Sequence, residues 1–315
     1  MSSSGSMTNG NDLKLTLPVA DGYPILLVTG DDLRHERFAI RMLAEFPEQI
    51  VGWLQLATAN DAVTQQPNQR LQERRTLQEF IRGTRAVISS LLRQYQNGTG
   101  ESGGLRSRTQ LSGSRESLQA TERKIFGKEI ERFRKNGTLW PITVDNAESD
   151  LVLARIERLN PCFILAYCNS PCIPNLRKAF SGMILSQSDL ADPELGASPS
   201  VYWALYHRDL SKIVSSVRVW RNGGDQGMVV RCSSPCFAVD DTPETCFLRE
   251  SAVGTELMCE VVSNLLRTKS VRLDGCQSNE AAEMFHSPPS EIRREVAVDL
   301  RKGLIRREVA RKMMF

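Results

Sequence analysis

The first part of the chain alternates between two patterns of hydrophobic and polar residues. Residues 23–30 form an apolar run that ends in glycine, as a buried strand does before a turn. Residues 33–45 carry apolar side chains at helical spacing, with Asp31 and Asp32 before them as capping candidates. A second short apolar run follows at 50–56. Strand, capped helix and strand in this order predict the opening of a parallel α/β sheet.

Residues 57–136 interrupt this pattern. Apolar residues recur at helical spacing in 69–96 and again in 118–135, which predicts two amphipathic helices. Between them, residues 97–117 are rich in glycine, serine and arginine, a composition typical of a mobile loop. We therefore predict a helical insertion inside an α/β domain.

The alternation of strands and helices resumes after the insertion. Predicted helices lie at 150–159 and 255–267, and predicted strands at 161–167, 180–185, 212–220 and 228–231. The predicted fold class is α/β, with a Rossmann-like, mostly parallel sheet over residues 23–267. Ligands of such sheets bind at the carboxyl ends of the strands. No Gly-x-Gly-x-x-Gly pattern is present, which argues against a nicotinamide or flavin cofactor.

The two ends of the chain are expected to lie outside this domain. Residues 1–22 are polar and lack the pattern of a secretion signal, so they read as a flexible leader of a cytoplasmic protein. Residues 268–315 read as a basic helical tail, with Ser290 as the N-cap of one helix and a second helix after Gly303. No apolar run is long enough to span a bilayer, and we expect no membrane contact.

Charge is distributed unevenly along the chain. The formal net charge is only +3, but residues 70–136 and 291–315 together carry +12, whereas the remainder carries −9. Two interpretations stay open. The basic helices either dock on the acidic body or simply face solvent, or they contact a protein or a phosphate-bearing partner.

Metal-ligating residues are few or badly spaced. The three histidines are His35, His207 and His286, so we expect no histidine-based metal centre. The 8 cysteines lack the two-residue spacing of zinc knuckles. Most of them are expected to be reduced and buried as small hydrophobic residues.

Two motifs in the second half carry a resemblance to a known family. Trp-Ala-Leu occurs at 203–205 in a predicted helix, and Asp-Gln-Gly occurs at 225–227 after an alternating strand. In this order they resemble the formyltransferase family that uses 10-formyltetrahydrofolate, which includes methionyl-tRNA, glycinamide-ribonucleotide and sugar-amine formyltransferases. The resemblance covers about residues 23–56 and 118–267.

The resemblance also implies candidate site residues. Asp225 matches the family's catalytic aspartate, whereas the family's Asn-x-His motif falls on Ser186 and Ser188, or on Leu185 and Gln187 in a register shifted by one. The candidate catalytic residues are therefore Asp225, Ser186 and Ser188, and the candidate folate-binding residues are Gly223, Gly224 and Gly227.

The expected function follows from this resemblance and from its gaps. One interpretation is a divergent formyltransferase that uses 10-formyltetrahydrofolate, without a metal, to formylate an amine, with His207 or His35 as a relocated base. The alternative is an inactive member of the fold that acts as a binding or regulatory partner, in which Asp225 caps a turn. A sugar-nucleotide or RNA-binding module is a third interpretation. The oligomeric state stays open.

Overall fold

The structure of the 315-residue chain is a computed structural model. It describes residues 14–16, 22–57, 115–136, 140–144, 150–168, 172–187, 197–221, 227–273 and 287–313. The helix predicted at 69–96 and most of the loop predicted at 97–117 lie outside these residues. The last three residues of that loop instead belong to helix α3 (Arg115–Asn136), which confirms the second predicted helix of the insertion.

The described residues form a seven-stranded sheet with the order β4-β3-β2-β5-β6-β7-β8. Its strands are β2 (Ile25–Thr29), β3 (Ile50–Leu56), β4 (Ile142–Val144), β5 (Phe163–Tyr167), β6 (Met183–Gln187), β7 (Ser215–Trp220) and β8 (Met228–Ser233). From β4 to β6 all neighbours are parallel, and β7 and β8 are added antiparallel. The predicted α/β class with a mostly parallel sheet is confirmed, and the strand order reverses between β2 and β5.

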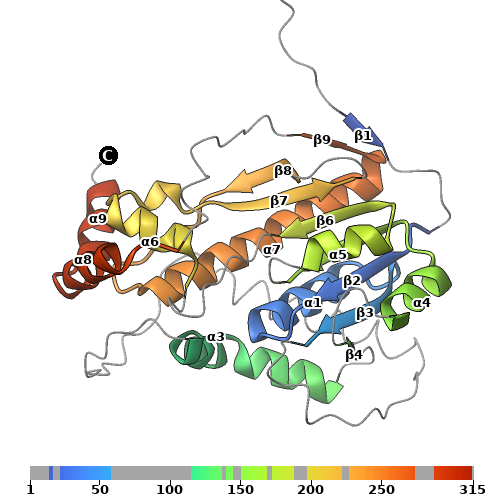
Figure 1. Cartoon of the computed structure of the whole chain (residues 1–315), viewed down its shortest axis with the longest axis horizontal. Coiled ribbons are helices and arrows are strands. Elements are labelled where there is room, and N and C mark those ends of the chain that lie inside the picture. Colours follow the sequence, from blue (N-terminus) through green and yellow to red (C-terminus); the bar gives the residue numbers. More distant parts are fainter. Residues whose placement is uncertain are drawn as a thin grey trace, which may run out of the picture.

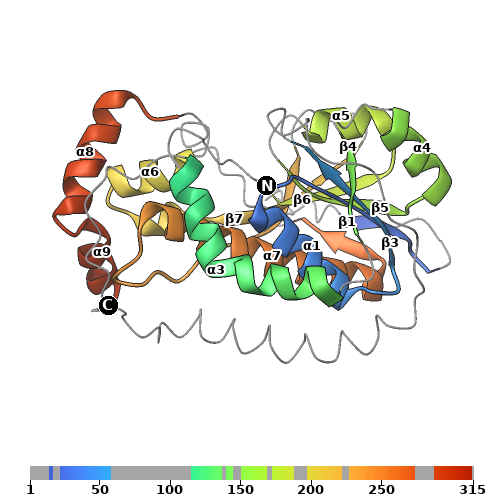
Figure 2. The ribbon, with the colours of Figure 1, turned by 90° about the horizontal axis from the view of Figure 1, so that it is seen from below.

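Helices cover both faces of this sheet. The described α-helices of the chain are α1 (Leu33–Glu45), α3, α4 (Asp150–Leu159), α5 (Cys172–Ala179), α6 (Pro199–Tyr206), α7 (Pro243–Thr268), α8 (Ser290–Arg301) and α9 (Leu304–Met313), of which α8 and α9 lie beyond the sheet, near α6. One face carries α1 and α7, with α3 packed outside them, and the other face carries α4 and α5 (Figures 1 and 2). We call these the α7 face and the α5 face.

Strands β2 and β5 form the centre of the sheet. Every residue of both strands is buried, because helices cover both faces of a parallel sheet and no side chain needs to meet water. Their register runs from Ile25↔Phe163 to Thr29↔Tyr167 without a break. This explains why the sequence shows uninterrupted apolar runs here rather than alternation.

Helix α7 begins earlier than the sequence predicts. The apolar pattern places its start at residue 255, but the helix starts at Pro243 with Thr242 as its N-cap. The Thr242 hydroxyl accepts from the Thr245 amide at 3.3 Å, and the Thr242 amide donates to the Thr245 hydroxyl at 2.7 Å. A capping box usually carries Glu or Gln at this third position. Because threonine stands at this position, the sequence does not show the usual capping-box pattern.

Two strands start later than the sequence predicts. The strand predicted at 180–185 is β6, which starts at Met183. Phe180 still belongs to the end of α5, because its amide closes the last turn of that helix, and its ring folds over Gly182, where a Cβ would clash. The strand predicted at 212–220 begins at Ser215, because the residues before it form a short 3-10 helix.

The segment expected as a leader contributes one described strand. Strand β1 (Lys14–Thr16) pairs antiparallel with β9 (Ser270–Arg272), directly after α7. These two strands form a small sheet of their own among the described residues.

The tail forms two helices that pack near α6. Helix α8 starts at Ser290 with Pro289 at the capping position, so Ser290 is the first helical residue rather than the N-cap. Gly303, at a φ of 75°, turns the chain into α9. An ion pair of 2.8 Å joins Arg208, after α6, to Asp299 of α8. None of the described helices is long and apolar enough to cross a membrane.

A pair of helical glycines provides a test of this packing. A Cβ on Gly254 of α7 would lie 2.5 Å from Gln187 Nε2, whereas a Cβ on Gly127 of α3 would meet nothing within 4 Å. Gly254→Ala should therefore lower the free energy of unfolding by about 1–3 kcal/mol through overpacking. Gly127→Ala should raise it by about 0.5–1 kcal/mol, since alanine favours the helix. Urea unfolding of both variants measures this, and equal effects would contradict the close contact between α7 and β6.

Candidate functional site

The two faces of strand β6 carry different polar groups. Ser186 lies on the α5 face, and Gln187 lies on the α7 face, because successive residues of a strand point to opposite sides. Both are buried at the carboxyl end of the strand. The resemblance assigns the family's catalytic motif to this stretch, so the question is which face offers a site.

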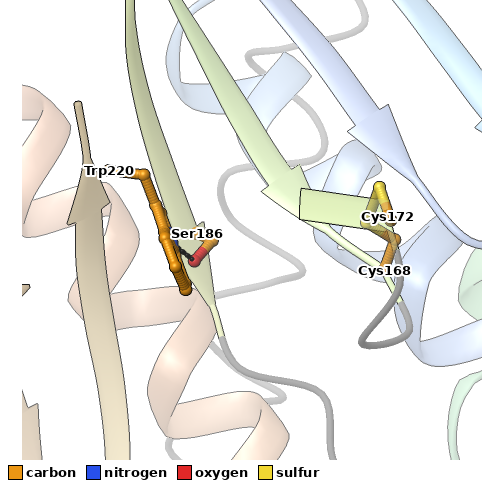
Figure 3. The surroundings of a disulfide bond; sticks show 4 residues. All are labelled: Cys168, Cys172, Ser186 and Trp220. Carbon is orange, nitrogen blue, oxygen red and sulfur yellow. Dashed lines mark hydrogen bonds between the residues drawn. A yellow bond between two sulfur atoms is a disulfide. The ribbon is translucent and has the colours of Figure 1, made fainter. Parts of the chain in front are cut away.

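On the α5 face, Trp220 joins two of the predicted site residues. The indole Nε1 of Trp220 donates to Ser186 Oγ at 2.7 Å (Figure 3). Gly227 lies beneath the same ring, where a Cβ would be 2.5 Å from the indole. Only glycine lets the backbone approach the ring this closely. Ser186 and Gly227 therefore belong to one arrangement, and Trp220, which the sequence analysis did not name, connects them.

Arg218 lies beside this arrangement. It is the register partner of Ser186 on β7, and its guanidinium Nη1 donates to the Gly227 carbonyl at 3.4 Å. Burial lowers the pKa of the Arg218 guanidinium from its ordinary value. We call Ser186, Arg218, Trp220 and Gly227 the Trp220 cluster. It combines a hydroxyl, a cation and a half-buried aromatic ring, which suits a planar ligand that carries negative charge.

The other predicted site residues are not described by the structure. Asp225, Ser188, Gly223 and Gly224 all lie outside the described residues. Their assigned roles stay predictions.

On the α7 face, the polar groups form a bonded layer. The Tyr167 hydroxyl and Ser251 Oγ are 2.7 Å apart, and Gln187 Nε2 donates to the Ser251 carbonyl at 2.8 Å. Thr255 Oγ1 donates to Gln187 Oε1 at 3.4 Å. These bonds tie β5 and β6 to α7. Gln187, which the shifted register aligns with the family's histidine, therefore has a structural role.

The two described histidines lie away from the Trp220 cluster. His35 is fully buried on the α7 face, over Gly30 and edge-on to the Tyr167 ring at 4.7 Å between centroids. The sheet separates it from Ser186. His207 is exposed after α6, where its ring stacks on Trp203 at 6.0 Å. His286 lies outside the described residues.

Carboxylates surround the start of α1. Asp32 occupies the N-cap position, and Arg34 pairs with Asp32 at 2.8 Å and with Glu122 of α3 at 2.7 Å. The Arg34 guanidinium also lies over the Phe247 ring at 5.5 Å. In many doubly wound domains the N-terminus of the first helix binds a phosphate group. In this chain the carboxylates at that N-terminus disfavour a phosphate group.

Helix α3 docks with a polarity that differs in part from the prediction. In one contact α3 supplies the basic residue, as predicted: Arg134 pairs with Glu36 of α1 at 2.6 Å. In two other contacts the charges are reversed, because Arg34 and Arg37 of α1 pair with glutamates of α3. The exposed side of α3 carries the basic residues Arg123, Lys124, Lys128, Arg132 and Lys135. Within the described part of the insertion, most of the basic side chains of α3 therefore face solvent rather than the body.

The sequence predicts that most cysteines are reduced and buried. Among the described residues five cysteines are free, of which Cys162, Cys232 and Cys236 are not buried, and one pair is oxidised. Cys168, directly after β5, and Cys172, the first residue of α5, form a disulfide with their Cα atoms 6.4 Å apart (Figure 3). Both parts of the prediction hold for Cys246 and Cys259, which are free and buried. Burial raises the pKa of both thiols. Sequence spacing did not reveal the pair, because a strand end and a helix start approach each other only in the folded chain.

No metal site emerges from the part of the chain that the structure describes. Within it, no group of three or more His, Cys, Asp or Glu side chains is placed to hold a metal ion.

Comparisons with known proteins find similarity only among solved structures. No family model and no curated protein matches the sequence. A sugar N-formyltransferase from Shewanella sp. is similar at a TM-score of 0.40 and 9% identity, over 81% of this chain and 74% of that chain. Phosphoribosylglycinamide formyltransferase from Streptococcus pneumoniae is similar at a TM-score of 0.39 and 14% identity, over 77% and 99%.

A third similar structure is an N-formyltransferase from Helicobacter canadensis in complex with folinic acid and dTDP-3-aminofucose. Its TM-score is 0.36 and its identity 10%, over 81% of this chain and 69% of that chain. At such TM-scores these likenesses support no statement about the activity of this chain.

Glu122 provides a test of the buried contact between α3 and α1. Burial raises the pKa of Glu122 above its ordinary 4.5, against the opposing effect of Arg34. The folded state therefore holds this proton more firmly than the unfolded chain, and its stabilising contribution falls as the pH rises through the interval between the two pKa values. Glu122→Gln cannot titrate, so the free energy of unfolding of the wild type, relative to that of the variant, should fall as the pH rises from 4.5. Urea unfolding across mildly acidic pH measures this. A wild type that gains stability relative to the variant as the pH rises would show that Arg34 outweighs burial.

Proposed function

We propose that this chain is a divergent formyltransferase-like protein that binds 10-formyltetrahydrofolate at the Trp220 cluster and passes the formyl group to a small-molecule amine. The observation that carries this proposal is the contact from Ser186 through Trp220 to Gly227. It joins the strand and the turn to which the resemblance assigns catalysis and folate binding. The Trp-Ala-Leu helix α6 lies between β6 and β7, in the expected order.

The chemistry of the cluster suits a reduced folate. Such a ligand combines a planar, hydrogen-bonding ring with carboxylates. The Trp220 indole has its N–H bonded to Ser186 and its ring supported by Gly227, so it offers a fixed surface for a flat ring. Arg218 beside it supplies a positive charge for a carboxylate.

Formyl transfer needs a proton acceptor and a donor to the developing oxyanion. An amine attacks the formyl carbon, the carbonyl oxygen gains negative charge, and the amine loses a proton. Ser186 Oγ accepts the Trp220 N–H, so its own O–H remains available as a donor. In this proposal Ser186 and Ser188 steady the oxyanion, and Asp225 takes the proton from the amine. As the oxyanion collapses, the bond from the formyl carbon to the donor nitrogen breaks, and Asp225 returns the proton to that nitrogen, which leaves as tetrahydrofolate. Without the family's histidine, the rate should fall by about 10²–10⁴.

A second candidate function is binding without catalysis. It is favoured by the position of His35, which the sheet separates from Ser186, and by the exposure of His207. In this alternative the chain is a regulatory or partner protein. The basic exposed side of α3 and the tail then contact a protein or a phosphate-bearing partner.

Calorimetric titration with a stable analogue of 10-formyltetrahydrofolate tests the ligand. The wild-type chain should bind it, and Gly227→Ala should weaken binding by about tenfold or more, because a Cβ there displaces the Trp220 ring. Gly127→Ala is the matched control, since its Cβ meets nothing within 4 Å, and it should bind as the wild type does. Absence of binding by the wild type would reject the folate ligand and leave the partner function.

Asp225→Asn tests the catalytic role. With a panel of small amines, loss of the formyl group from 10-formyltetrahydrofolate is followed by absorbance. The substitution should lower the rate at least about 10²-fold while analogue binding stays near the wild-type level. Equal rates in variant and wild type would remove Asp225 from the reaction.

A further inference from the structure

The Cys168–Cys172 disulfide links the end of a central strand to the start of a helix. Cys168 follows the last residue of β5, and Cys172 opens α5. At this end of β5, the Gly30 amide of the neighbouring β2 segment donates to the Tyr167 carbonyl at 3.0 Å. The disulfide therefore lies at the carboxyl edge, where the strand order reverses and doubly wound sheets bind their ligands.

The disulfide also lies next to the Trp220 cluster. Ala166 is the register partner of Ser186, and Cys168 follows two residues later, on the same face of the sheet. Figure 3 shows the disulfide at the end of the strand beside the one that carries Ser186. Helix α5 extends the connection further, because Arg177 Nη2 donates to the carbonyl of Arg221, the residue after Trp220, at 3.3 Å.

The position of the pair suggests a role other than that of a staple. The loop that it closes is too short to restrict the unfolded chain strongly. The strand before it is already held by burial on both faces. What the bond does restrict is the junction between β5 and α5, and hence how firmly the first turn of α5 stays on the sheet.

Helix α5 is suited to local opening. It has only eight residues, and of its side chains Cys172, Ile173 and Leu176 are buried. The two cysteines are themselves only 5% and 7% exposed, so a reagent reaches their sulfurs only when this turn opens. Short helices with few buried side chains open locally at low free-energy cost.

From these observations we propose that Cys168 and Cys172 are a reversible redox pair, which exchanges with small disulfides and controls the opening of α5 beside the Trp220 cluster. The cofactor class is a low-molecular-weight thiol and its disulfide, such as glutathione. The proposal does not depend on the folate ligand.

The exchange balances in two steps. The Cys172 thiolate attacks glutathione disulfide, whose S–S bond breaks to release one glutathione and to leave a mixed disulfide on Cys172. Cys168 then loses its proton and attacks Cys172 Sγ, which forms the intramolecular bond and expels the second glutathione. The two protein thiols lose two electrons in total, and one glutathione disulfide becomes two thiols. A thiol at the first position of a helix favours the thiolate, which is why Cys172 attacks first.

The test uses the full chain equilibrated in glutathione buffers from fully reduced to fully oxidised. Acid quenching, alkylation and mass spectrometry of the peptide that contains both cysteines measure the fraction of disulfide. We expect a single transition in which both thiols change together. A pair that stays reduced in excess glutathione disulfide, or that stays oxidised in excess glutathione, would overturn the proposal.

Hydrogen exchange of α5 tests the structural effect. Reduction should speed amide exchange in α5 by about tenfold or more, since the restraint at its first turn is lost. Cys168→Ser should show the fast exchange in both buffers, whereas Cys236→Ser, at an exposed free cysteine, should respond to glutathione as the wild type does. If Cys168→Ser fails to fold, the reduced wild type provides the same comparison. Equal exchange of α5 in both redox states would reject control of this helix by the pair.

Discussion

The pairing of β2 with β5 is the constraint on which the rest of the structure depends. Both strands are buried on both faces, so their side chains fill the core, and the polar side chains at their carboxyl ends have structural partners. Their last residues show this. Thr29 accepts the Trp53 indole N–H at 2.9 Å, and the Tyr167 hydroxyl bonds Ser251. Ligand chemistry at this edge must therefore come from residues after the strands, or from β6 and β7.

The register of β6 decides which of its polar residues can serve that chemistry. Pairing of Ser186 with Ala166 turns Ser186 towards the α5 face, and Gln187 towards α7. A slip of one residue would exchange the two. Gly254 stabilises the observed register, because only a residue without a Cβ leaves room for the Gln187 amide against α7. The polar residues on the α7 face thus have structural roles. The candidate site lies on the α5 face, where α5 and the disulfide are next to the Trp220 cluster.

The sequence predicted elements whose signals are local and missed features that need the folded chain. The opening strand, helix and strand could be predicted, since apolar runs and the Asp32 capping position mark them. The start of α7 was missed because Thr245 replaces the usual capping residue. The disulfide and the Trp220 contact were missed for a different reason, because each depends on the distance between separate elements. Ser186 was named only through the resemblance. No pattern in the sequence identifies Trp220 of β7 as its hydrogen-bond partner.

The geometry separates binding from catalysis in a way that the motifs alone do not. Ser186 accepts the indole N–H and can donate to an oxyanion, but an unperturbed hydroxyl takes no proton from an amine at neutral pH. His35 is held on the opposite face of the sheet, so it cannot substitute as the base. In the proposed function, the residues of the Trp220 cluster bind the ligand, whereas turnover requires a group from outside the cluster. If Asp225 supplies that group, the chain is a slow enzyme. If Asp225 only caps its turn, the proposed function is reduced to binding without catalysis.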